Sequence, residues 1–560
     1  MAWNLADLFT SVQEYESSKG DLAQLLAERA DEKRSSESIE FLEELSTRFE
    51  LLEAYIALSL AHDRSNTYYS NEEQSLLLLN TKIKNIKKQL VRNSDKLSGS
   101  DKNIVYAFFV SRLKRVFAHQ ADEKTESMIS DMERINGENW TSLRKIELQK
   151  LRSTDDQSLC VIQARQLESE DAVRQNSLLE EIKMCRKAEE VSCRALNAIK
   201  AENNMVSKAR GHSSAMDMVL HNEGIPFCFI SASLASMGKV SKNILSGIAK
   251  KQSRIGTDSF KWYNINYISH NQKTLPLSFE NAIEVIKKAF HRFHPEAGKM
   301  VERSVSHNLI NYEKVETKRS GAFCTNVTAK KSTYLMLTYS ENLRSYISLA
   351  HELGHGFHYS LMNKHGYLAN AAPTTLKESV AHLFEILACQ ELCIQYPEHC
   401  QQIYEMQLTS LASTWIDVQS RYLFEKEVFE RCSDHYFTPE ELTQLMLSKQ
   451  KEIIGDYENE DAYNPTTWIS KPHFYYSEKP YYNFPYMIGR LLSYYLYGRI
   501  KDDANFTNEL ISMLETSGMC LFSESLNKIG INETAPDWSR SENEIVSVIN
   551  QFSSSINKSF

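Results

Sequence analysis

Two histidines and a glutamate lie close together in the segment His351-Glu352-Leu353-Gly354-His355. If the segment is helical, residues four apart share one face with about 6 Å between their Cβ atoms, so both imidazoles can bind one metal ion. The carboxylate of Glu352 then lies beside them as a base for an activated water molecule. The spacing therefore predicts a zinc-type hydrolytic site with His351 and His355 as ligands and Glu352 as general base.

A catalytic zinc ion usually has three protein ligands, so a further ligand must come from another part of the chain. His358 is unsuitable because seven residues of helix, a rise of roughly 10 Å, separate it from His351. Two donors on one zinc ion are at most about 4 Å apart. The longer histidine motif of some zinc peptidases also fails, because position 361 is leucine.

The segment 374–385 is the next candidate source of a ligand. It is predicted to be a helix on which Glu378, His382 and Glu385 share one face, so each of the three could reach a metal ion. A second interpretation is that Thr375 and Glu378 form a capping box, in which case Glu378 only closes the start of the helix. Glu385 is then the alternative ligand, and otherwise it orients a metal-bound imidazole through a hydrogen bond.

An aromatic cluster extends from His473 to Tyr486. Hydrolysis of an amide builds negative charge on the carbonyl oxygen, and imidazole and phenol groups are suitable donors to that charge. The same run fits a packed core or the wall of a ligand pocket. The cluster is therefore a candidate for oxyanion stabilisation, with a structural role as the alternative.

Two short strands are predicted before the metal-binding helix, at 321–328 and 332–338, because β-branched and aromatic residues are frequent there. A small sheet beside that helix would offer an edge to which an extended peptide could add as a strand. The pattern fits a purely structural hairpin equally well.

The rest of the chain favours helices, because 560 residues contain only 18 Gly and 11 Pro. Amphipathic periodicity predicts helical segments at 36–62, 71–93, 102–120, 122–152 and 158–208. Over about 210–276 the sequence changes to Gly- and Ser-containing segments with short apolar runs, which places a lobe boundary near 195–210. We therefore expect an N-terminal helical lobe over 1–200 and a catalytic region over 201–560.

Charge and composition argue against several classes of partner. The net charge is −9 and there is no basic block, so no nucleic-acid partner is expected. No apolar run approaches about 18 residues, and the start of the chain does not resemble a secretory signal, so no membrane partner is expected. Ten cysteines without C-x-x-C spacing fit buried small side chains. We expect a cytoplasmic protein, either a monomer or a dimer.

Four motifs resemble the M3 family of zinc metallopeptidases, and within it the oligoendopeptidase F branch. The motifs are Lys318-Arg319-Ser320-Gly321-Ala322-Phe323-Cys324, the segment 349–358 around the histidine pair, Glu378 with Glu385 seven residues on, and His473-Phe474-Tyr475 leading to Tyr482 and Tyr486. A weaker likeness reaches the N-terminus at Trp3 to Phe9. The resemblance is most specific between residues 318 and 490.

The resemblance implies a mainly α-helical, two-lobed fold of the neurolysin and thimet oligopeptidase type. It implies a small sheet beside the metal-binding helix and a deep channel that admits short peptides. One zinc ion per chain would be bound by His351, His355 and Glu378, with Glu352 activating water. The residues implied for substrate and transition-state binding are Gly321, Ala322, Phe323, His473, Tyr482 and Tyr486.

We therefore expect a zinc-dependent oligoendopeptidase that cleaves internal bonds of short peptides. Two alternatives stay open at this point. One is a catalytically inactive relative that binds peptides or acts as a scaffold. The other is a zinc aminopeptidase or carboxypeptidase, which would need an anchor for the free end of its substrate.

Overall fold

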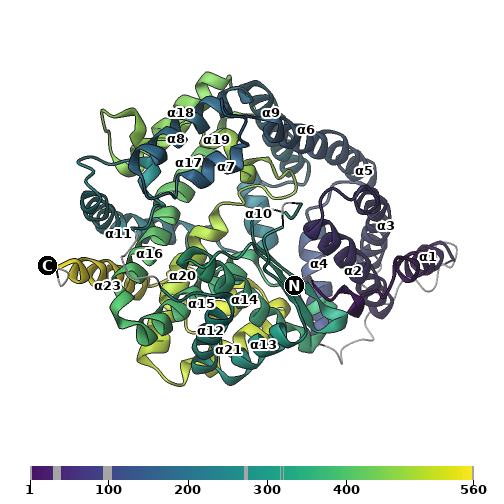
Figure 1. The fold of residues 1–560 in the computed structure, drawn as a ribbon. Coiled ribbons are helices and arrows are strands. Elements are labelled where there is room, and N and C mark those ends of the chain that lie inside the picture. The colour runs from purple at the N-terminus through teal and green to yellow at the C-terminus, as the bar shows by residue number, and fades with distance from the viewer. Residues whose placement is uncertain are drawn as a thin grey trace. The chain divides into compact units, whose positions relative to one another are not determined.

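The computed structural model describes residues 3–28, 39–92, 104–269, 275–315, 317–319 and 321–557 (Figure 1). The described chain is mainly helical, as predicted, and its strands form a small sheet. Contacts divide the chain into two compact units, and each unit combines three separate stretches of sequence. The first unit comprises Met1–Ala118, Leu275–Gln395 and Arg499–Ile531, and the second comprises His119–Thr274, Tyr396–Gly498 and Asn532–Phe560.

The first unit contains the histidine pair, the small sheet and the helices that pack around them. Its helices are α1 (Val12–Glu28), α2 (Ile39–His62), α3 (Thr67–Arg92), α4 (Ile104–Phe117), α12 (Phe279–Phe293), α13 (Pro295–Ser306), α14 (Leu343–Met362), α15 (Thr374–Gln395), α21 (Phe506–Thr516) and α22 (Phe522–Lys528). Its strands are β1 (Ile310–Asn311), β2 (Phe323–Val327) and β3 (Ser332–Met336).

The second unit contains helices and no named strand among its described residues. Its helices are α5 (Glu123–Met132), α6 (Glu138–Lys150), α7 (Leu159–Arg165), α8 (Asp171–Arg186), α9 (Glu189–Ala209), α10 (Ala215–Glu223), α11 (Phe227–Arg254), α16 (Cys400–Ala412), α17 (Gln419–Arg431), α18 (Pro439–Ile454), α19 (Thr467–Ser470), α20 (Phe484–Asp502, which continues past the unit boundary) and α23 (Ser539–Asn557). The predicted division at residue 200 falls inside α9, and the extent of an N-terminal lobe stays a prediction. None of the described helices is long and apolar enough to span a membrane.

The predicted segment 158–208 is divided into three helices, α7, α8 and α9, instead of continuing as one. The reason for the first break lies in buried Arg174, whose guanidinium donates to the carbonyls of Glu168 and Ser169 at 2.8 and 2.6 Å. The same guanidinium donates to Asn264 at 2.8 Å, so a distant residue stabilises the turn. Local periodicity could not reveal this break, because the segment contains neither Gly nor Pro.

The strand predictions are confirmed by β2 and β3, which pair in antiparallel register from Phe323 opposite Met336 to Val327 opposite Ser332. A short 3-10 turn joins them and ends at Lys331, whose φ is +47°. The two-residue strand β1 adds in parallel to β3 and was not predicted, because so short a segment carries no periodicity. The strand order is β1-β3-β2, so β2 lies at an edge of the sheet.

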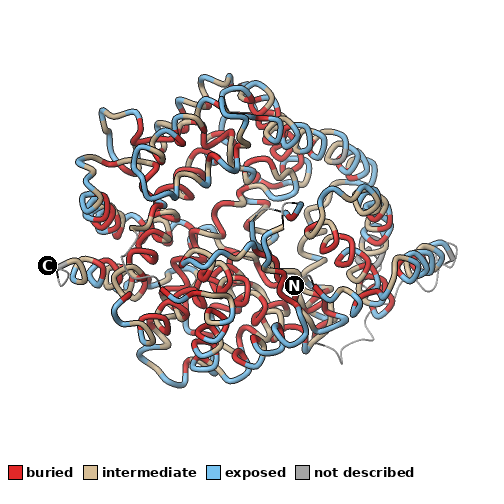
Figure 2. Tube along the Cα trace, viewed as in Figure 1, coloured by how far each residue is buried: buried red, intermediate tan, exposed pale blue. Residues whose placement is uncertain are grey.

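The sheet packs against α14, and α14 packs closely on α15 in the first unit (Figure 1). An apolar stripe runs along α14, because Tyr346, Ala350, Leu353, Phe357 and Leu361 are all buried. Buried residues run along both α14 and α15 (Figure 2).

Gly354 lies at a close contact between α14 and α15. A Cβ atom built at Gly354 would lie 3.0 Å from both the Cα of Ala381 and the Cβ of Phe384. At Gly356 the nearest atom to a built Cβ is the Sδ of Met300 at 3.5 Å, which is an ordinary contact. Glycine at position 354 therefore allows the helix that carries Glu378 to lie against the helix that carries the histidines.

We predict opposite effects for alanine at these two glycines. Gly354→Ala should lower the free energy of unfolding by about 1–3 kcal/mol, because the added methyl group overpacks the contact with α15. Gly356→Ala is the matched control and should be neutral or stabilising by up to about 1 kcal/mol, because alanine favours the helix. Urea denaturation of both variants measures the difference. Equal stability of the two variants would contradict the close-packing account.

Candidate metal centre

Helix α14 holds both histidines of the predicted site on one face. It begins after Asn342, whose side chain accepts a hydrogen bond from the backbone N–H of Ser345 at 3.0 Å, a normal N-cap. The rings of His351 and His355 lie 4.7 Å apart between centroids and are perpendicular to one another. Their side chains keep 17% and 14% of their surface exposed, so both imidazoles stay partly accessible to solvent.

Helix α15 brings the carboxylate of Glu378 to these two imidazoles. Its Oε2 atom lies 3.5 Å from Nε2 of His351 and 3.9 Å from Nε2 of His355. Donors that share one zinc ion in tetrahedral geometry, each at about 2.1 Å, are about 3.4 Å apart. The Oε2 atom is also buried and forms no hydrogen bond within the described chain, so a cation would satisfy it. The three donors therefore fit a zinc ion.

The capping-box interpretation of Glu378 does not hold. Thr375 is the second residue of α15, and its buried hydroxyl finds no hydrogen-bond partner among the described residues. Of the two interpretations that the spacing left open, the structure therefore favours Glu378 as a ligand.

Glu385 lies two turns further along α15 than Glu378 and contacts the same site. Its Oε1 atom accepts hydrogen bonds from Nδ1 of His351 at 2.7 Å and from Nδ1 of His382 at 2.8 Å. Because Nδ1 of His351 donates this bond, Nε2 of the ring faces Glu378. A ring with its proton on Nδ1 has Nε2 available to bind a metal ion. His351, His382 and Glu385 also form a second group of potential ligands. That group uses the Nδ1 face of His351, opposite the one that faces Glu378.

His358 is directed elsewhere, as its spacing predicted. Its Nε2 atom forms a 2.8 Å hydrogen bond with the hydroxyl of Ser517, and burial lowers its pKa to about 3. This histidine therefore acts as a neutral, packed side chain within the first unit.

The electrostatics of the site favour a positive charge between its carboxylates. Burial alone would lower the pKa of His351, but Glu378 and Glu385 outweigh it and raise that pKa well above its usual value. Burial would likewise raise the pKa of Glu378, yet the two histidines lower it to about 2. Burial lowers the pKa of His355 to about 3 and raises that of Glu352 to about 7. Neutral His355 and ionised Glu378 are the forms in which these side chains bind metal.

The aromatic cluster belongs to the second unit, where the structure brings His473, Tyr482 and Tyr486 together. The ring of His473 stacks on Tyr482 at 5.7 Å, and the hydroxyl of Tyr486 donates to that of Tyr482 at 3.2 Å. Burial, with help from the charges of Arg421 and Lys471, lowers the pKa of His473 to about 3. Arg421 donates to Nδ1 of His473 at 3.4 Å, so the ring proton resides on Nε2.

A buried ion pair beneath this cluster was missed by the sequence analysis. Lys200 and Glu425 are both fully buried and lie 2.6 Å apart. Glu425 also accepts from the backbone of Tyr481 and from the side chain of Asn483, which flank Tyr482. No spacing rule links residues so far apart in sequence. The two charges need each other only because folding buries both of them away from water.

The residues that the motif resemblance assigned to substrate lie just before the edge strand β2 and at its first position. Gly321 and Ala322 are exposed and Phe323 is half-buried. Lys318 anchors the preceding segment, because its buried amine donates to the carbonyls of Asn311, Glu313 and Leu337 at 2.7–3.0 Å. Burial lowers the pKa of this lysine to about 8. Ser320 lies outside the described residues.

Comparison with known proteins identifies the class. Residues 166–537 match the model of peptidase family M3. The chain therefore belongs to peptidase family M3, a family of zinc-dependent metallopeptidases that act on peptides. The family assignment made from the motifs is confirmed, and the His-His-Glu group has the geometry of its metal site.

The relatives and solved structures that resemble this chain include oligoendopeptidase F proteins. The chain is 20% identical to oligopeptidase PepF of Bacillus subtilis, over 96% of this chain and 84% of that protein. Identity reaches 26% with an oligoendopeptidase F homolog of Borreliella burgdorferi, over 49% and 48% of the two chains. Oligoendopeptidase F from Enterococcus faecium has a similar fold, with a TM-score of 0.68, 16% identity and coverage of 99% and 98%. The PZ peptidase A structure with an inhibitor gives a TM-score of 0.76 at 15% identity, covering 96% and 97%.

We predict that Glu378 and Glu385 differ in their effect on zinc affinity. Glu385→Gln should weaken zinc binding by about 10–100-fold, because it loses the charge that orients His351. Glu378→Gln should weaken it further, because it removes an anionic ligand. Competition with a chromophoric chelator measures both affinities.

Glu391→Gln is the control for these two variants. Glu391 is a buried carboxylate on the same helix, but it pairs with Arg292 at 3.0 Å and not with the histidines. Its loss should leave zinc affinity unchanged. Wild-type affinity in Glu378→Gln would exclude this residue as a ligand.

Proposed function

We propose that the chain is a zinc-dependent oligoendopeptidase that hydrolyses internal bonds of short peptides. The observation that carries the proposal is the convergence of His351, His355 and Glu378 on one point, with Glu352 on the same helix turn as the histidines. When bound there, zinc would supply Lewis-acid activation of a water molecule and of the scissile carbonyl.

Glu352 is proposed as the general base. Its side chain is largely buried, and burial raises the pKa of its carboxyl to about 7. A carboxylate in such surroundings accepts a proton from water more readily than an exposed one, and it can pass that proton to the leaving amine. Glu385 would act through His351 by fixing the ring's tautomer and direction.

His473, Tyr482 and Tyr486 are proposed to stabilise the oxyanion. A neutral imidazole with its proton on Nε2 is a hydrogen-bond donor that adds no charge of its own. The buried pair of Lys200 and Glu425 would hold the Tyr482 loop in place, which lowers the cost of organising these donors when substrate binds.

The edge of β2 is proposed to bind the peptide. Strand order leaves one side of β2 without a partner strand in the described sheet, so an extended peptide could extend the sheet there. Gly321, Ala322 and Phe323 would then contact substrate. The deep channel, the single zinc ion per chain and the cytoplasmic location all stay predictions.

We predict that Glu352→Gln separates metal binding from catalysis. The variant should keep one zinc ion and lose about 10²–10⁴-fold in kcat, because the amide cannot accept the proton of water. Metal analysis together with cleavage of an internally quenched fluorescent peptide measures both effects. The wild type should also lose activity with a chelator and regain it with zinc, whereas an inactive scaffold would show no chelator-sensitive cleavage. Normal turnover by Glu352→Gln would refute the assigned base.

We predict that the enzyme needs neither free end of its substrate. A peptide blocked at both its amino and carboxyl ends should be cleaved at an internal bond at a rate within about tenfold of the free peptide, because each lost end charge contributes little at an exposed position. Mass spectrometry of the products locates the bond. Failure on amino-blocked peptides would favour an aminopeptidase, and failure on carboxyl-blocked peptides a carboxypeptidase.

A further inference from the structure

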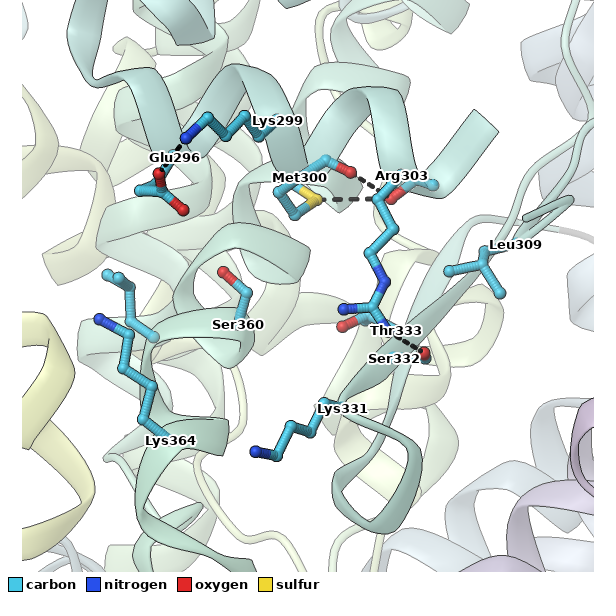
Figure 3. A pocket seen from close by; sticks show the side chains of 12 residues that line it. Glu296, Lys299, Met300, Arg303, Leu309, Lys331, Ser332, Thr333, Ser360 and Lys364 are labelled. Carbon is cyan, nitrogen blue, oxygen red and sulfur yellow. Dashed lines mark hydrogen bonds and ion pairs between the residues drawn. The ribbon is translucent and has the colours of Figure 1, made fainter. Parts of the chain in front are cut away.

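A hollow of about 230 Å³ lies in the first unit and contains none of the proposed metal ligands in its lining (Figure 3). Helix α13, the turn and start of β3, and the last turn of α14 with the residues after it form its walls. On this measure about 10–15 Å³ is enough for one water molecule, so the hollow has room for several. It is therefore large enough for a small ligand.

Positive charge gathers around this hollow. Lys299, Arg303, Lys331 and Lys364 line it, and the one lining carboxylate is Glu296. The whole chain carries a net charge of −9, so this local excess of cations runs against the composition. Lysine and arginine grouped in a concave site attract anions, because the low-dielectric walls strengthen their field.

Two of these four cations pair with carboxylates, and the other two do not pair with any described carboxylate. Lys299 pairs with Glu296 at 2.8 Å, and Lys364 pairs with Glu515 at 3.1 Å. Arg303 and Lys331, in contrast, form no ion pair with any described residue. The only side-chain bond of Arg303 in the described chain is a 3.3 Å contact to the hydroxyl of Ser332.

Lys331 ends the turn before β3, and its side chain is one of those that line the hollow (Figure 3). Its φ of +47° lies in the left-handed region, which costs a non-glycine residue roughly 1 kcal/mol. Strained positions of this kind are often found where a side chain must be aimed at a ligand. Hydroxyl groups of Thr333 and Ser360 add polar atoms to the walls, and Leu361 adds apolar surface.

We propose that this hollow is a binding site for a small phosphate-type polyanion, with the size of a diphosphate. The planar guanidinium of Arg303 matches two oxygens of one phosphoryl group, and the amine of Lys331 supplies a point charge for a second group. The site is independent of the metal centre and of the proposed peptidase activity.

Calorimetric titration of the zinc-loaded chain with inorganic phosphate and with pyrophosphate tests the proposal. Sodium chloride keeps the ionic strength equal in all runs, which removes general screening. Arg303→Gln and Lys331→Gln each remove one charge from the hollow. Lys330→Gln is the matched control, because it removes the same charge from the neighbouring exposed residue outside the lining.

The wild type should bind one pyrophosphate per chain and bind it more tightly than phosphate. Arg303→Gln and Lys331→Gln should each weaken binding at least tenfold, while Lys330→Gln should stay within twofold of the wild type. Circular dichroism and zinc content, measured for every variant, show that the fold and the metal centre are intact. Absence of saturable binding, an equal loss in Lys330→Gln, or binding that survives both lining variants, as it would at the zinc ion, would overturn the proposal.

Discussion

The close approach of α14 and α15 is the constraint on which the metal centre depends. Two imidazoles on one helix supply only two ligands, and the third must reach them from a separate element. Glycine at position 354 permits the backbone of α15 to lie against α14 without a Cβ atom between them. Glu378 and Glu385 thereby arrive at opposite nitrogens of the His351 ring.

Burial then gives this arrangement its chemistry. Carboxylates removed from water require a compensating positive charge, and their field raises the pKa of His351 well above its usual value. A divalent ion between the same groups meets that requirement more fully than a shared proton, because it can accept a donor from all three side chains at once. The geometry of the peptidase family M3 site is thus a consequence of packing and electrostatics together.

Parts of this structure were predictable from the sequence, and the reasons are specific. His351, Glu352 and His355 follow from helical spacing, and β2 and β3 follow from their composition. Spacing could not choose between Glu378 as ligand and as helix cap, because the choice depends on whether Thr375 forms a hydrogen bond.

Other features were beyond local reasoning because they depend on distant partners. Asn264 bonds to Arg174 at the break between α7 and α8, and Lys200 pairs with Glu425 beside the loop of Tyr482. The roles of Gly354 and Lys331 emerge only when neighbouring helices and strands are in place. Apart from Lys331, each of these features involves a contact between residues far apart in the sequence.

The most direct measurement is the anomalous diffraction of a zinc-loaded crystal at the zinc edge. The account predicts one strong peak in the first unit, at about 2.0–2.2 Å from Nε2 of His351, Nε2 of His355 and a carboxylate oxygen of Glu378. A peak at the His382 and Glu385 side of His351, or no peak at the histidine pair in a protein that still cleaves peptides, would contradict it.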